Sequence, residues 1–124
     1  MTYTNRQDDI DKAKTITSKF YELVMAQKPD SIFNYCNNEI KTKSERQKQM
    51  QYILAESTRR FGKIKDIALI GASTKVRTGS KPFGEYRFTY KVLREKYTTK
   101  ENFILADEDG KIRVFTYGVE KFVD

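Results

Sequence analysis

The spacing of apolar residues changes at Gly62, and this change constrains the fold more than any other feature. Before Gly62, apolar residues recur every three or four positions, as they do on one face of a helix. After Gly62 they alternate with polar residues, as they do in half-buried strands. Helices followed by strands are typical of an α+β fold, with the helices on one face of an antiparallel sheet. The 124 residues are enough for one such domain.

The first half of the chain predicts three helices. Residues 5–27 carry an amphipathic pattern, and Thr4–Gln7 could act as a capping box at its start. Asp30 is placed to cap a short second helix. Ser44–Gln47 is a second capping box, which opens a third helix that ends at Gly62.

The second half predicts four strands in a meander, at residues 64–77, 86–93, 97–106 and 111–120. A hairpin loop at 107–110 joins the last two strands. The apolar phase switches within the last strand, which predicts a β-bulge there. The fold class is therefore α+β, with three N-terminal helices packed on a curved four-stranded antiparallel sheet. We treat the 124 residues as one domain whose residues 1–7 form a loose extension.

Several kinds of chemistry are excluded or disfavoured by composition. The chain has no histidine, which excludes catalytic triads and metal sites that need imidazole. Its single cysteine, Cys36, cannot form an internal disulfide, and we expect it to be a small buried side chain. A calcium loop starting at Asp107 would need a glutamate at position 118, which is Gly118. We expect no metal and no cofactor.

The positive charge is concentrated in the middle of the chain. The net charge is +7, and residues 41–100 alone carry +11. Scattered bases of this kind usually form a solvated surface, although they could attract an anionic partner. The bases predicted on the exposed side of two neighbouring strands are Lys75, Arg77, Arg87 and Lys91. No aromatic residue alternates with them, which disfavours nucleic acid as a partner.

The sequence contains no stretch that could cross a membrane. The longest apolar run, Ile67–Ala72, is far shorter than the roughly 20 residues required. The N-terminal residues have no apolar core of an export signal. The protein is then either cytoplasmic or, if an export signal precedes this sequence, periplasmic, secreted or lipid-anchored.

Three segments carry a resemblance to a known superfamily. They are Phe61–Ile64 between helix and sheet, Gly84–Tyr90 in the second predicted strand, and Glu108–Tyr117 at the last hairpin. With the order of elements, they make the chain resemble the cystatin-like, nuclear-transport-factor-2-like superfamily, and within it small bacterial domains that are often exported or lipid-anchored. The chain has Ile112 where such domains often carry tryptophan. The resemblance implies a cone-shaped fold with a cavity between helices and sheet, and homodimers formed through the sheet.

The strand phases and this resemblance together predict which side chains face the cavity. The candidate pocket residues are Tyr21, Tyr35, Tyr86, Tyr90, Arg94 and Tyr117. Asp66 is in phase with Ala68 and Ile70, so it is the candidate for a catalytic base. The alternative is that Asp66 lies in water near the end of its strand.

These observations favour a non-enzymatic binding or interaction domain of the bacterial envelope, with a small ligand or an envelope protein as partner. The first alternative is a small-molecule pocket protein or an isomerase- or dehydratase-like enzyme that uses tyrosine and aspartate. A basic nucleic-acid-binding protein is a weaker alternative. An open cavity with converging polar groups would favour a pocket protein, whereas a filled cone would favour an interaction domain.

Overall fold

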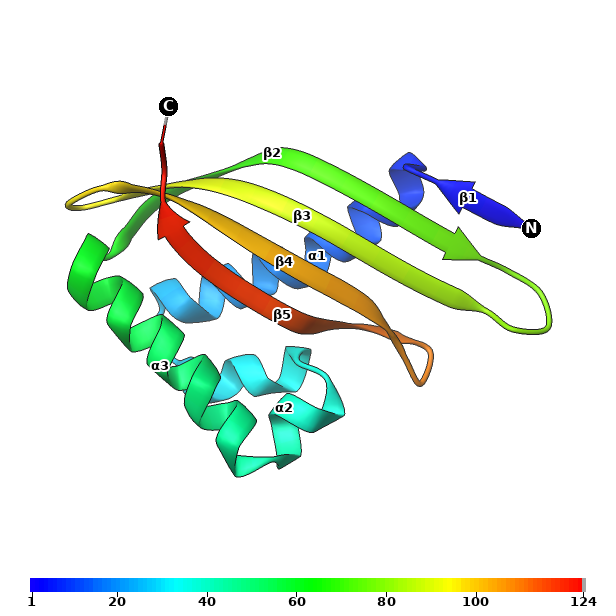
Figure 1. Ribbon diagram of the computed structural model, residues 1–124, viewed down its shortest axis with the longest axis horizontal. Coiled ribbons are helices and arrows are strands. Elements are labelled where there is room, and N and C mark those ends of the chain that lie inside the picture. Colours follow the sequence, from blue (N-terminus) through cyan, green and yellow to red (C-terminus); the bar gives the residue numbers. More distant parts are fainter. Residues whose placement is uncertain (124) are drawn as a thin grey trace.

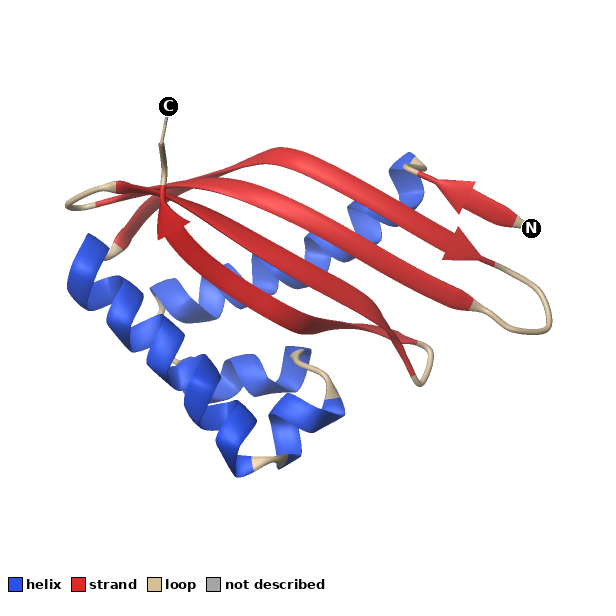
Figure 2. Ribbon diagram, viewed as in Figure 1, coloured by secondary structure: helices blue, strands red, loops and turns tan. Residues whose placement is uncertain are grey.

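The computed structural model describes residues 1–123 (Figure 1). The elements are β1 (Thr2–Thr4), α1 (Gln7–Met25), the 3₁₀ helix η1 (Pro29–Tyr35), α2 (Asn38–Thr42), α3 (Ser44–Phe61), β2 (Ile64–Arg77), β3 (Phe83–Arg94), β4 (Thr98–Glu108) and β5 (Lys111–Lys121). The strands form one antiparallel sheet in the order β1-β2-β3-β4-β5. The helices lie on one side of it (Figure 2). The predicted α+β class and antiparallel sheet are confirmed. The predicted number of helices and strands was only roughly right, because the structure adds β1 and α2.

The N-terminal residues are not a loose extension. Thr2–Thr4 pair with the end of β2 and add a fifth strand to the sheet. Asn5 follows with φ of 53°, and its Oδ1 accepts the N–H of Thr74 at 2.9 Å, which turns the chain from β1 into α1. Thr4 therefore cannot cap α1, and the residue before the helix is Arg6.

The second predicted capping box is also not formed. Ser44 is the first residue of α3, and its side chain makes no capping hydrogen bond. Gln47 instead donates its side-chain N–H to the carbonyl of Lys41, at 2.5 Å. The short helix α2, which the sequence pattern did not predict, precedes α3 and is capped by Asn37, whose Oδ1 accepts the N–H of Ile40 at 2.9 Å.

The predicted bulge in the last strand is present. Ile104 pairs with Thr116 and Leu105 with Val114, so Phe115 is the extra residue on β5. The bulge lets Val114 and Tyr117 both face the core, although their sequence phases differ. The hairpin before β5 turns at Asp109 and Gly110, whose φ values are both positive, as a two-residue hairpin turn requires.

Aromatic side chains fill the space between the helices and the sheet. Phe20 of α1 meets Phe103 of β4 and Tyr117 of β5, with ring centroids 5.2 and 4.9 Å apart. Tyr21 meets Tyr90 of β3 edge to face at 5.1 Å. All five side chains are at most 3% exposed. The part of the molecule that a cone-shaped fold could leave hollow is therefore a packed aromatic core.

Candidate functional site

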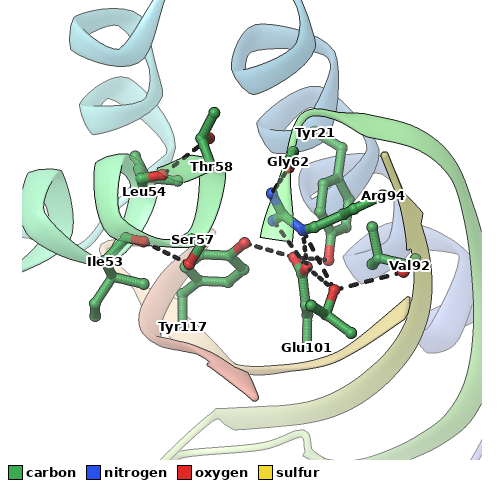
Figure 3. A network of polar contacts seen from close by, with 11 residues as sticks. Tyr21, Ile53, Leu54, Ser57, Thr58, Gly62, Val92, Arg94, Glu101 and Tyr117 are labelled. Carbon is green, nitrogen blue, oxygen red and sulfur yellow. Dashed lines mark hydrogen bonds and ion pairs between the residues drawn. The ribbon is translucent and has the colours of Figure 1, made fainter. Parts of the chain in front are cut away.

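A buried polar cluster interrupts this aromatic core, and Glu101 of β4 is its centre (Figure 3). The carboxylate is fully buried and forms an ion pair with Arg94 of β3, whose Nη2 lies 2.8 Å from Oε2. Arg94 Nε also donates to Oε2 at 3.0 Å, and Thr99 Oγ1 donates to it at 2.6 Å. Oε1 accepts the hydroxyls of Tyr21, at 3.0 Å, and Tyr117, at 2.5 Å.

Arg94 extends the cluster to the junction of α3 and β2. Its Nη1 donates to the carbonyl of Gly62 at 3.0 Å (Figure 3). The cluster thus connects α1, β3, β4 and β5 with the end of α3. Such a pair, with its other polar atoms satisfied, specifies how these elements pack together.

The geometry does not equip Glu101 as a catalytic base. Its two oxygens accept five hydrogen bonds, so no lone pair is left for a substrate proton. Burial raises the pKa of Tyr21, and the neighbouring Tyr117 and Glu101 raise it further. Burial also raises the pKa of Tyr117, with the charge of Glu101 as the next cause. Both phenols therefore stay protonated and act as fixed donors to the carboxylate.

The structure brings together some of the predicted pocket residues and separates others. Tyr21, Arg94 and Tyr117 converge on Glu101. Tyr90 lies beside Tyr21, but its hydroxyl shares a 2.6 Å hydrogen bond with Thr17 of α1.

The other two predicted pocket residues lie outside the cluster. Tyr86 is buried further along β3 and donates to Asp107 Oδ1 at 2.9 Å. Burial raises the pKa of Tyr86, and the hydrogen bond to Asp107 adds to this effect. Tyr35 is half-buried at the end of η1.

Sequence analysis missed Glu101 and Thr99, although a signal for both was present. They have the same strand phase as Phe103 and Leu105, which face the core. A glutamate in that phase, beside a strand whose own inward phase ends at Arg94, indicates a buried ion pair. The signal was overlooked because charged residues are rarely fully buried.

Asp66, the candidate catalytic base, faces away from the core. It is exposed, pairs with exposed Leu93, and accepts the N–H of Ile67 at 2.9 Å through Oδ1. Irregular pairing after Ile64 shifts the phase of β2, so that Ile67 and Leu69 face inward. Asp66 therefore lies in water near the start of its strand, which was the alternative; Ala68 and Ile70 share its phase and are exposed too, so the expectation that this phase faces inward is wrong.

The predicted basic residues are all exposed, and the acidic Glu85 lies among them. Glu85 lies opposite Lys75 and forms an ion pair with Arg87, 2.7 Å from its Nη2. Arg77 donates to the carbonyl of Lys81 at 2.9 Å. Lys91 Nζ lies 4.8 Å from the ring centre of Phe122.

One hollow is a groove outside the aromatic core, where the end of α1 and the start of η1 face α3. Its volume is about 530 Å³, and its lining is mostly apolar. Four lining residues come from α1 and the segment after it, and four from α3: Val24, Gln27, Pro29, Asp30, Gln51, Leu54, Ala55 and Thr58. Asp30 is the only ionisable residue among them.

A second hollow, of about 400 Å³, continues the groove toward the start of β2. The two hollows share Val24, Gln27 and Thr58, and the second adds Met25, Lys63 and Ile64. This hollow is more polar than the first, and Lys63 is its only ionisable residue. The groove and this hollow together are called the α1–α3 groove below. None of the predicted pocket residues lines it.

Other candidate features offer no reactive group. Cys36 is 2% exposed, and burial raises the pKa of its thiol to about 12. Within residues 1–123, no three acidic or cysteine side chains are grouped as a metal ion would need. None of the helices described has both the length and the apolar composition for crossing a membrane.

Comparison with protein-family models, curated proteins and solved structures finds no match to this chain. The resemblance to the cystatin-like superfamily and the predicted homodimer stay predictions.

Proposed function

We propose that this domain is a non-enzymatic binding module that takes a small, largely apolar molecule in the α1–α3 groove. The observation that carries the proposal is the position of the hollow space. The interior under the sheet is filled by aromatic rings and by a cluster whose central carboxylate is saturated. The hollow between the helices has a volume of about 530 Å³, which is in the range of small-molecule sites.

The lining of the groove supports the same function. Val24, Pro29, Leu54 and Ala55 provide its apolar lining. Gln27, Gln51 and Thr58 provide a few polar groups that could orient a ligand. A mostly apolar surface with a few polar groups is the usual composition of a ligand site. Among the lining residues, the hydroxyl of Thr58 donates to the carbonyl of Leu54 at 3.1 Å, and no cysteine or histidine lies beside it, which supports binding rather than catalysis.

The test uses a neutral apolar fluorophore, N-phenyl-1-naphthylamine, whose emission rises in an apolar site. We expect it to bind the unmodified protein with one saturable site. Ala55→Trp should abolish binding, because the indole would occupy the groove. Ala68→Trp is the matched control, since Ala68 is exposed, pairs with Lys91 and lines neither hollow.

Thermal unfolding of both variants shows whether they are folded. If a folded Ala55→Trp variant binds the fluorophore as well as Ala68→Trp does, the groove is not the site. If the unmodified protein does not bind the fluorophore at all, the proposed function is wrong.

A further inference from the structure

The two ends of the α1–α3 groove differ in polarity and in the sign of their charge. Asp30 is the ionisable residue at the apolar end, beside Pro29 and Gln51. Lys63 is the ionisable residue at the more polar end, beside Gln27 and Thr58. The two ends adjoin each other, because both hollows are lined by Val24, Gln27 and Thr58. A ligand that fits both ends has an apolar part, a polar part and a preferred direction.

From this arrangement we infer that the ligand is an anionic amphiphile, such as a medium-chain carboxylate, with its charged group at Lys63 and its apolar chain along Leu54 and Ala55. This inference rests on the proposed function and adds the class and the orientation of the ligand.

The exposure and surroundings of the Lys63 side chain support the binding of an anionic head group there. Its side chain is exposed, and among residues 1–123 no acidic group lies within 4.0 Å of its Nζ. The nearby Glu95 is engaged with the backbone, because its Oε1 accepts the N–H of Lys63 at 2.8 Å. The ammonium group is therefore available for a carboxylate, and a charge-assisted hydrogen bond there would strengthen binding.

The positive charge of the chain around Lys63 also favours an anionic ligand. Residues 41–65, which include all of α3, contain eight bases and two acids. Three of these bases already form ion pairs, Arg59 with Glu56 and both Lys43 and Arg46 with Glu39, but the segment as a whole stays positive. Such a field attracts an anionic ligand and disfavours a cationic one. Asp30 at the opposite end opposes a head group bound in the reverse direction.

The experiment compares three ligands with the same ten-carbon chain: decanoate, 1-decanol and decyltrimethylammonium. Each is titrated calorimetrically below the concentration at which it aggregates. We expect decanoate to bind about tenfold more tightly than 1-decanol, as one charge-assisted contact would produce, and the cationic ligand to bind most weakly. Lys63→Gln should remove the preference for decanoate. Lys65→Gln is the matched control, because Lys65 is an exposed lysine that lines neither hollow.

The orientation has its own measurement. Decanoate with a nitroxide at its methyl end should broaden the amide signals of Gln51 and Ala55 more than that of Lys63. Broadening strongest at Lys63 would overturn the orientation.

The outcomes separate the inference from the proposed function. If the three ligands bind with equal affinity, or if Lys63→Gln keeps the preference, the anionic class is wrong and the groove remains an apolar site. If no ligand binds and the neutral fluorophore also fails, the proposed function itself is wrong.

Discussion

Glu101 shows how one buried residue can determine the arrangement of several elements. Its carboxylate receives donors from α1, β3, β4 and β5, and Arg94 carries the connection to Gly62. Removing one partner of such a pair lowers the free energy of unfolding by more than the intact pair contributes to it. The reason is that the remaining charge is buried without a counter-charge.

Glu101→Gln should therefore destabilise the fold by about 3–5 kcal/mol, because the Arg94 guanidinium would be left buried without its counter-charge. The measurement is the free energy of unfolding in urea. Glu120→Gln is the matched control, since Glu120 forms an exposed ion pair with Lys100 at 3.4 Å. That variant should lose less than about 1 kcal/mol. Equal losses would show that the buried pair has no special role.

At the scale of elements, three glycines differ in their backbone conformation and in the space around them. Gly62 ends α3 with φ of 89°, and a Cβ placed there would lie 2.7 Å from the Cβ of Glu95. Gly110 has φ of 77° in the last hairpin, but a Cβ there would meet nothing within 4 Å. Gly118 lies within β5, also with open space around it.

Alanine at these three positions should have graded effects on the free energy of unfolding. Gly62→Ala should cost at least about 2 kcal/mol, because left-handed strain and a steric clash act together. Gly110→Ala should cost about 1 kcal/mol from the backbone strain alone. Gly118→Ala should be neutral or stabilising by about 0.5 kcal/mol, because alanine restricts the unfolded chain. A Gly62→Ala variant as stable as Gly110→Ala would contradict the close approach to Glu95.

At the scale of the whole molecule, burying protonated phenols makes stability depend on pH at the alkaline end. The ordinary pKa of tyrosine is 10.0, and the folded protein holds the pKa of Tyr21 and of Tyr117 above this value. Above pH 10 the unfolded chain releases these protons while the folded chain keeps them. Their contribution to stability is therefore complete below pH 10 and is lost as the pH rises further.

We expect the free energy of unfolding to fall with pH above about 10, with about 1.4 kcal/mol per pH unit from each buried tyrosine. Urea denaturation between pH 9 and about 11 measures this slope. Tyr21→Phe should make the decrease of stability with pH less steep, by about 1.4 kcal/mol per pH unit, the contribution of one tyrosine. Tyr52→Phe should leave it unchanged, because Tyr52 is 67% exposed and its hydroxyl meets water in both states. An unchanged slope for Tyr21→Phe would show that Tyr21 does not contribute.

Local patterns were sufficient for most of the elements. The period of apolar residues located α1, α3 and the strands β2 to β5, and the phase switch in β5 correctly indicated the bulge at Phe115. Periodicity reports which face of one element is apolar, and each of these elements is long enough to show it. β1 has three residues and α2 has five, too few for a period to be recognised.

The candidate site depended on contacts that no local pattern contains. The α+β class and the helices on one face of an antiparallel sheet were determined by the sequence, because hydrophobic periodicity acts within each element. The orientation of Asp66 was decided by irregular strand pairing, and the cluster around Glu101 by donors up to 80 residues away. The α1–α3 groove arises because two helices distant in sequence leave space between them. Only tertiary packing decides such spaces, since they belong to no single segment of the chain.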